Sequence, residues 1–177
     1  RSGVKLASMR SGAITAEQVA EMQPARDEIR VCPIFIYDEA EPTIGTIRAE
    51  ARRLKARVGP LGVVVIDYLQ LVRGVGRFDV REQEVASVSR GIKAMAKELD
   101  CPVIALAQLN AGETGKANPR PRAKDLRESR GIWNDADSVV LIWDPDKEKI
   151  EQGKCADEGN RDFIVDKNRH GPTGVAK

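Results

Sequence analysis

A run of β-branched residues that ends in a carboxylate constrains this chain more than any other stretch. Residues 63–66 read Val-Val-Val-Ile, and Asp67 follows them directly. Such a run predicts a strand buried on both faces, with the acid at its carboxyl end, where open α/β sheets bind ligands. A carboxylate there can hold a Mg²⁺ ion that bridges nucleotide phosphates. It can equally cap a turn after an ordinary core strand, so the run alone leaves both interpretations open.

Helix and strand patterns alternate around this run. The expected elements are short helices at 15–22 and near 24–28, a strand at 33–38, a helix at 43–58, a strand at 63–66, a helix at 80–100, strands at 101–107, 137–143 and 161–167, a solvated loop at 144–160 and a hairpin turn at 168–174. A strand, a long helix and a further strand in succession predict a parallel pair. Gln108 and Asp67 then fall at the same edge of the sheet.

The composition indicates a folded domain without a strong overall charge. The 177 residues are 41% apolar, and 29 Lys and Arg against 27 Asp and Glu leave a net charge of +2. Any site for a polyanion must therefore be local, and residues 116–130 form the most basic stretch. The three cysteines show no C-x-x-C spacing, and no apolar run is long enough to cross a bilayer. We expect reduced thiols, no membrane partner and a cytoplasmic protein.

Four blocks of the sequence resemble, in the same order, the C-terminal ATPase domain of DnaB-type replicative DNA helicases. They are VVVIDYLQL at 63–71, PVIALAQLN at 102–110, DLRESRGIWNDAD at 125–137 and KNRHGPTG at 167–174. The resemblance implies an α/β fold: a RecA-like P-loop NTPase core with a mostly parallel sheet flanked by helices. It also implies an enzyme that couples ATP hydrolysis to 5′-to-3′ translocation on single-stranded DNA and to duplex unwinding in replication.

The resemblance implies roles for four residues in the chemistry of ATP. Asp67 resembles the Walker B acid that orders Mg²⁺, and Gln108 resembles the polar sensor of the γ-phosphate. An amide suits that task because it can donate to phosphate oxygen and accept from water. Lys167 and Arg169 resemble the lysine and the arginine finger that reach from one subunit into the nucleotide site of the next. Without the resemblance, Gln108 could also be an ordinary strand-end amide, and Lys167 and Arg169 could be surface charges of a hairpin.

A second group of residues resembles the part of the family that contacts DNA. Arg127 and Glu128 match a loop that follows the phosphate backbone of single-stranded DNA, which binds without reading sequence. The family usually has Gly directly after the Ser of that block, whereas here Arg130 intervenes and Gly131 comes one place later. The resemblance further implies a homo-oligomer, expected to be a hexameric ring, with primase and a helicase loader as further partners.

The chain lacks one motif that this chemistry requires. No stretch fits G-x-x-x-x-G-K-[ST], and residues 112–117 have too few residues between their glycines and Ala where the hydroxyl belongs. The family has its P-loop upstream of the position of Arg1. We therefore expect residues 1–177 to be a partial RecA-like domain, truncated at both ends and almost inactive alone. The alternatives are another RecA-like ATPase, of the recombinase or clock type, and a catalytically inactive DNA-binding remnant.

Overall fold

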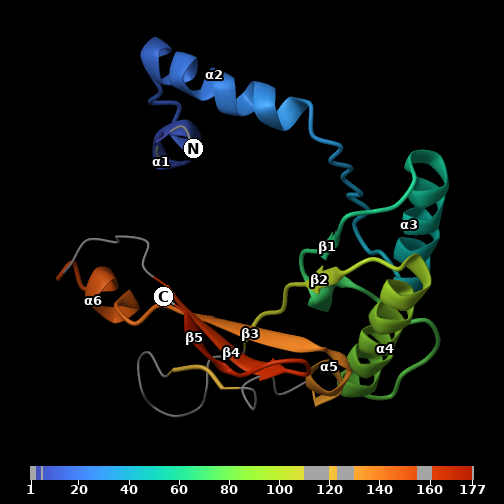
Figure 1. Cartoon of the computed structure of the whole chain (residues 1–177). Coiled ribbons are helices and arrows are strands. Elements are labelled where there is room, and N and C mark those ends of the chain that lie inside the picture. Colours follow the sequence, from blue (N-terminus) through green and yellow to red (C-terminus); the bar gives the residue numbers. More distant parts are fainter. Residues whose placement is uncertain (1–2, 5, 110–119, 123–129, 155–160, 177) are drawn as a thin grey trace. The chain divides into compact units, whose positions relative to one another are not determined.

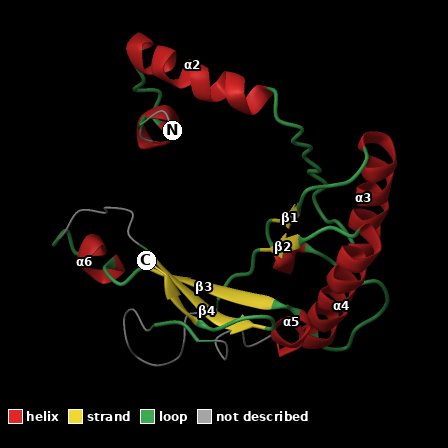
Figure 2. Cartoon of the chain, in the orientation of Figure 1, coloured by secondary structure: helices red, strands yellow, loops and turns green. Residues whose placement is uncertain are grey.

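The structure is a computed structural model that describes residues 3–4, 6–109, 120–122, 130–154 and 161–176. The chain divides into two units, Arg1–Glu39 and Ala40–Lys177. Figure 1 labels the elements of both units, and Figure 2 shows that the strands all belong to the second. Within the described residues, no helix combines the length and the apolar character needed to span a membrane.

The first unit contains two helices, α1 (Leu6–Arg10) and α2 (Ala16–Arg30). Thr15 caps α2 as expected: its hydroxyl accepts from the Gln18 backbone N–H at 3.2 Å, and the Gln18 side chain accepts from the Thr15 N–H at 3.1 Å. The helix continues through Pro24, so one helix replaces the two that the sequence predicted. None of its residues is buried.

The strand expected at residues 33–38 is wrong, because these residues form neither a helix nor a strand. A strand is stable only when a neighbouring strand satisfies its backbone N–H and C=O groups. The described part of the first unit contains helices and no strand that could pair with this segment. The apolar side chains of this segment are accordingly exposed, with Ile36 reaching 86%.

The second unit is organised around the predicted parallel pair of strands, which is confirmed. Strand β1 (Val64–Ile66) lies parallel to β2 (Val103–Ala105), with Val64 opposite Val103 and Ile66 opposite Ala105. Between them come a single 3₁₀ turn, η1 (Leu69–Leu71), and the long helix α4 (Arg81–Leu99). The long helical connection is what allows the two strands to run in the same direction.

Helices α3 (Ile44–Val58) and α4 build the core against this pair. Thr43 caps α3 as predicted, through a capping box with Thr46. The two helices approach closely at Gly91, where a Cβ atom would lie 2.6 Å from the Ile44 side chain. The buried apolar residues of the cluster are Ile44, Ala51, Ile66, Leu69, Val72, Val85, Val88, Met95, Leu99 and Cys101.

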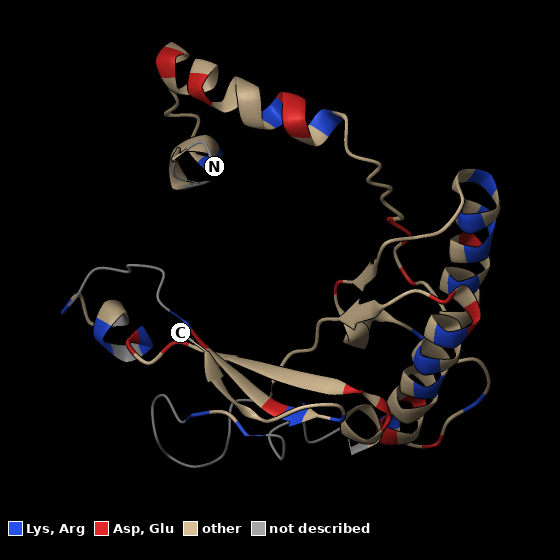
Figure 3. Ribbon diagram, in the orientation of Figure 1, with Lys and Arg blue, Asp and Glu red and all other residues tan. Residues whose placement is uncertain are grey.

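The basic residues of α3, which Figure 3 shows in blue, are partly engaged with α4. Arg48 and Arg52 form ion pairs with Glu98, and the Lys55 ammonium donates to the Leu99 carbonyl at 2.6 Å. That last bond satisfies one of the carbonyls that the C-terminus of α4 leaves without an intrahelical partner. Much of this basic face therefore holds the two helices together.

Among the described residues of the second unit, only one face of the parallel pair packs into the core, which corrects the expectation that β1 is buried on both faces. Ile66 and its neighbours on the inner face pack into the cluster, whereas Val65 is 57% and Ile104 53% exposed. Alternate residues of a strand point to opposite faces, so the same apolar run supplies both the core and the exposed surface.

The C-terminal strands form a separate antiparallel sheet in the order β3–β4–β5. Its strands are β3 (Ser138–Trp143), β4 (Asp162–Asn168) and β5 (Gly174–Ala176), which confirms the expected strands and the hairpin turn. Helix α5 (Arg130–Asp135) precedes β3. Helix α6 (Lys147–Glu151) lies in the segment that was expected to be a loop.

A β-bulge interrupts the pairing of β3 with β4. Val140 lies opposite Val165 and Val139 opposite Lys167, so Asp166 is an extra residue on β4. An extra residue reverses the alternation of the strand beyond it. Lys167 therefore shares a face with Val139, although Val165, two residues away, shares the opposite face with Val140.

Candidate functional site

Asp67 and Gln108 lie at the carboxyl ends of the two parallel strands, as the sequence predicted. Asp67 follows Ile66 at the end of β1, and backbone bonds continue the pairing past it: Leu106 donates to Ile66 at 2.9 Å and Leu69 to Leu106 at 2.8 Å. The peptide bond between Asp67 and Tyr68 is cis. Among the described residues, no side chain or backbone group forms a hydrogen bond or ion pair with the Asp67 carboxylate or with the side-chain amide of Gln108. Both groups are exposed at the edge where a ligand of an α/β sheet binds.

Gln70 ties the ends of the two strands together. Its side-chain carbonyl accepts from the Gln108 backbone N–H at 3.3 Å, and its side-chain amide donates to the Gln108 backbone carbonyl at 3.2 Å. The Arg81 guanidinium of α4 in turn donates to the Gln70 backbone carbonyl at 2.6 Å. Sequence reasoning missed Gln70, although it lies three residues after Asp67 in the block that carried the resemblance.

The donor set at this edge fits Mg²⁺ only in company with phosphate. The described residues contain no group of three or more His, Cys, Asp or Glu side chains that could hold a metal ion by themselves. Mg²⁺ is commonly held by one or two carboxylates, with substrate phosphates and water completing its octahedron. A single unpaired carboxylate such as Asp67 meets that description, since it supplies one hard oxygen ligand and leaves the other positions open.

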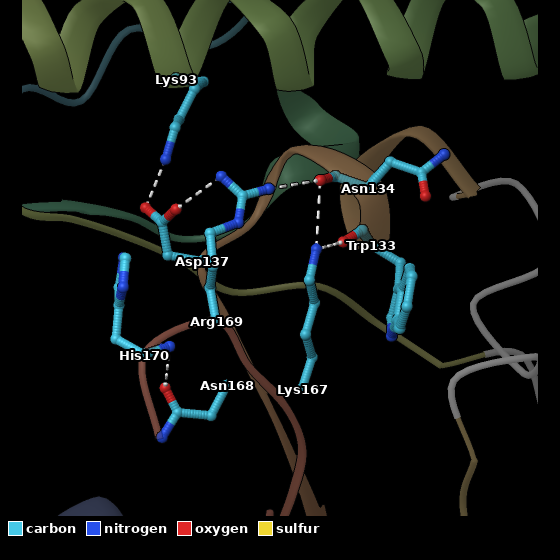
Figure 4. A network of polar contacts seen from close by, with 8 residues as sticks. All are labelled: Lys93, Trp133, Asn134, Asp137, Lys167, Asn168, Arg169 and His170. Atoms are coloured by element: carbon cyan, nitrogen blue, oxygen red, sulfur yellow. Dashed lines mark hydrogen bonds and ion pairs between the residues drawn. The ribbon is translucent and has the colours of Figure 1, made fainter. Parts of the chain in front are cut away.

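Lys167 and Arg169 form a second cluster, on β4 and the turn that follows it. No hydrogen bond or ion pair between described residues joins it to Asp67 or Gln108. Figure 4 shows both cations reaching the C-terminal end of α5. The Lys167 ammonium donates to the carbonyls of Trp133 at 2.6 Å and Asn134 at 3.1 Å. It also lies 4.5 Å from the centroid of the Trp133 ring.

Arg169 makes three contacts in the same place. Its Nη2 donates to the Asn134 carbonyl at 3.3 Å, and its Nη1 donates to the Asp137 carboxylate at 3.2 Å. Its backbone N–H donates to the Asp137 carbonyl at 2.8 Å. Two cations thus satisfy carbonyls that the last turn of α5 cannot satisfy itself.

The charges of this cluster shift the pKa of two of its groups. The hydrogen bond from Lys93 holds the pKa of Asp137 below its usual range, and the positive charges of Lys93 and Arg169 act in the same direction. Desolvation lowers the pKa of Lys167, and the neighbouring charge of Arg169 lowers it further. Asp137 is therefore the anion around which Lys93 and Arg169 gather.

Sequence reasoning missed four members of the second cluster: Lys93, Trp133, Asn134 and Asp137. Asp137 closes the block at 125–137, but its role follows only from the register. Ser138 pairs with Asn168, so the residues just outside the pair, Asp137 and Arg169, face each other. Trp133 takes part through its ring, through its carbonyl and through its indole N–H, which donates to Asp166 at 3.2 Å.

Of the three residues expected to contact DNA, the structure describes Gly131. Arg127 and Glu128 lie outside the described residues. Gly131 lies in α5, where a Cβ atom would be 2.8 Å from the Cβ of Ala86 on α4. Glycine at this position allows α5 to approach α4 closely, which is a packing reason for the residue.

Known proteins resemble this chain along nearly its whole length. Residues 1–177 match the family described as DnaB-like helicase C terminal domain. The chain is 43% identical over 174 residues to the replicative DNA helicase DnaB of Leifsonia xyli subsp. xyli (strain CTCB07), a match that covers 98% of this chain and 37% of that protein. It is 39% identical over 172 residues to the replicative DNA helicase DnaB of Geobacillus stearothermophilus, covering 96% of this chain and 37% of that protein. The chain thus spans little more than a third of the length of these relatives.

Solved structures share the fold. A DnaB-like replicative helicase, determined together with its interactions with primase, superimposes with a TM-score of 0.81 at 31% identity, over 92% of this chain and 39% of that one. A further solved ATPase domain gives a TM-score of 0.85 at 28% identity, over 99% of this chain and 62% of that one. The expected α/β, RecA-like fold class is confirmed. Because the family match covers every residue of the chain, the protein belongs to the DnaB-like helicase C-terminal domain family.

Proposed function

We propose that this chain is part of a replicative DNA helicase. In this proposal it works in a homo-oligomeric, hexameric ring that couples ATP hydrolysis to 5′-to-3′ movement on single-stranded DNA and to duplex unwinding. The observation that carries the proposal is the family match along residues 1–177. We further propose that the protein works in the cytoplasm, with primase and a helicase loader as partners. The solved DnaB-like relative that interacts with primase supports the first of these partners.

Asp67 and Gln108 are the proposed nucleotide-site residues of this chain. Asp67 would hold Mg²⁺, the ion that neutralises charge on the phosphates of ATP when both are bound. Gln108 would contact the γ-phosphate and the attacking water through its free amide. Their place at the carboxyl ends of two parallel strands, with neither side chain bonded to another described residue, supports these roles.

Lys167 and Arg169 are the proposed trans-acting cations. They lie in a cluster that no bond between described residues connects to Asp67, as expected if they serve the nucleotide of the neighbouring subunit. A planar guanidinium matches the phosphoryl oxygens and neutralises the charge that spreads over them in the transition state. Lys167 would add a second positive charge beside it.

Arg127, Glu128 and Gly131 are the proposed DNA contacts. Arg127 would bind the phosphate backbone without reading bases, which suits a motor that must pass over any sequence. Gly131, packed on Ala86, would hold α5 against α4 directly after these residues in the sequence. We expect Arg127→Ala to weaken single-strand binding equally for all sequences and to reduce its salt dependence. A loss confined to particular sequences would argue for base contacts instead.

Mixing two inactive variants tests the central claim. The experiment uses the complete subunit, with the P-loop segment that family members have upstream, because residues 1–177 contain no such motif and should hydrolyse almost no ATP alone. Asp67→Asn removes the proposed metal ligand, and Arg169→Ala removes the proposed finger. Each homogeneous ring should lose turnover, while Arg169→Ala should still bind nucleotide.

Mixed rings should regain part of the turnover. Where an Asp67→Asn subunit presents its intact Arg169 to the intact Asp67 of an Arg169→Ala subunit, one complete site forms. Rings assembled from either variant alone are the control. Turnover that stays absent after mixing, although native gels show mixed rings, would contradict a finger that acts between subunits. Full turnover in the Arg169→Ala ring would contradict any catalytic role for that residue.

A further inference from the structure

Asp137 is the residue that holds Arg169 most completely. Its backbone carbonyl accepts from the Arg169 backbone N–H at 2.8 Å, and its carboxylate accepts from Nη1 of the guanidinium at 3.2 Å. The first bond fixes where the backbone of Arg169 lies, and the second fixes the direction of its side chain. Figure 4 shows the Arg169 guanidinium between the Asp137 carboxylate and Asn134 at the end of α5.

Asp137 is itself fixed by a third element. The Lys93 ammonium forms an ion pair with the other carboxylate oxygen, Oδ2, while Arg169 uses Oδ1. Lys93 belongs to α4, whose residues Val88 and Met95 are almost completely buried in the core of the second unit. A carboxylate bound at both oxygens by groups from two elements has few orientations left, so the core helix determines where Arg169 is held.

The contacts leave part of the guanidinium available. Arginine has five N–H donors, and the contacts to Asp137 and Asn134 use one hydrogen on each of Nη1 and Nη2. The side chain is still 47% exposed. A long side chain loses rotamer entropy when it is fixed. An Arg already held in one direction loses less of that freedom when it meets a phosphate.

We propose that Asp137 is a positioning residue for Arg169: it aims the guanidinium at the nucleotide of the neighbouring subunit, with Lys93 fixing the carboxylate. This inference rests on the finger role proposed above for Arg169. Asp137 does not touch the nucleotide in this proposal and acts only through the arginine that it holds. Lys167 is not part of the inference, because its hydrogen bonds go to the carbonyls of Trp133 and Asn134.

The test compares Asp137→Ala with a matched control in complete, assembled rings. Asp144→Ala removes the same residue type at the other end of β3, where Asp144 pairs with Arg161 at 3.1 Å. ATP turnover is measured as kcat and as KM in the presence of single-stranded DNA. We expect Asp137→Ala to lower kcat about ten- to a hundredfold, the order of loss that misplacement of a reacting group causes. KM for ATP should stay within about twofold, and the control should leave both constants within about twofold.

A double-mutant cycle separates positioning from a structural role. In the Arg169→Ala background, Asp137→Ala should slow ATP consumption no further, measured in single turnover so that slow rates remain visible. An equal loss in both backgrounds, or an unchanged kcat for Asp137→Ala with Arg169 present, would overturn the inference alone. Full turnover of Arg169→Ala would overturn the finger role and the inference with it. If Asp137→Ala fails to fold, Asp137→Asn replaces it, and we expect a smaller loss that again disappears without Arg169.

Discussion

The side chain of Gln70 and the backbone of Gln108 exchange two hydrogen bonds, at 3.3 Å and 3.2 Å. The amide of Gln70 thereby takes the place of a strand residue beyond the end of β1, where the chain has already turned into η1. The backbone of the proposed phosphate sensor is thus fixed to the strand that carries Asp67.

Gln70→Ala should lower ATP turnover, because the Gln108 backbone loses both of its partners and the sensor amide loses its fixed position. We expect kcat of the complete subunit to fall several-fold, and the free energy of unfolding to fall by about 1 kcal/mol. Gln70→Glu should be no better, since it keeps the acceptor but sets a carboxylate oxygen against the Gln108 carbonyl. Gln83→Ala, at an exposed position of α4, is the control. Wild-type kcat in both Gln70 variants would contradict the positioning of Gln108 by this side chain.

Gly131→Ala should destabilise the fold through the contact of α5 with α4. The added methyl would lie 2.8 Å from the Ala86 Cβ and 3.0 Å from its Cα, so the helices must move apart. Overpacking of this kind costs about 1–3 kcal/mol, which denaturant unfolding can measure. Ala86→Gly in the same protein removes one of the two clashing carbons. The double variant should therefore lose less than the sum of the single losses, and a strictly additive loss would argue against this contact.

Glu84→Gln should remove a pH-dependent share of stability. Glu84 accepts from the Gly74 backbone N–H at 3.0 Å and pairs with Arg81, and the Gly74 bond is the main reason that its pKa lies below its usual range. A depressed pKa in the folded state stabilises the fold above the pKa of the unfolded chain, about 4.3, and this contribution disappears as the pH falls through the folded value. The free energy of unfolding of the wild type should therefore be about 1–2 kcal/mol larger than that of Glu84→Gln at pH 7.

That difference should narrow below about pH 4. Urea unfolding of both proteins between neutral and acidic pH measures it. Glu82→Gln, at an exposed position in the same turn of α4, controls for the loss of a charge near the helix N-terminus. A difference that stays constant across the pH range would show that the Glu84 charge does not support Gly74.

Local sequence patterns predicted most elements of the second unit. Apolar periodicity gave α3 and α4, and the two short apolar runs gave β1 and β2 with parallel pairing, which fixed Asp67 and Gln108 at one edge. The same patterns failed at residues 33–38, because a strand depends on a neighbour that local composition does not reveal. They also failed on the exposed face of β1, because a buried and an exposed valine look alike in a sequence.

The contacts of the candidate site were harder to foresee, because they depend on pairing between distant segments. Lys93 and Asp137 are 44 residues apart, and Arg169 is 32 residues from Asp137. The register of β3 with β4 brings Asp137 to Arg169, and the packing of α5 on α4 brings Lys93 to Asp137. Resemblance to the family assigned Arg169, but no sequence pattern indicated that its side chain would be held by the end of α5.

The register around the extra residue in β4 decides on which face of the sheet the side chains of Lys167 and Arg169 lie. Lys167 and Arg169 lie on the side of Asp137 and the end of α5 because Asp166 has no pairing partner on β3. If Asp166 were removed, Val165 and Lys167 would follow each other directly opposite Val140 and Val139, so both cations would keep the face that carries Val139. Removal of a second residue would shift Lys167 to a place opposite Val140 and turn both cations to the face that carries Val140 and Ile142. The strand can therefore lose its bulged residue and keep the cations beside their partners, whereas loss of a second residue should separate them without unfolding the sheet.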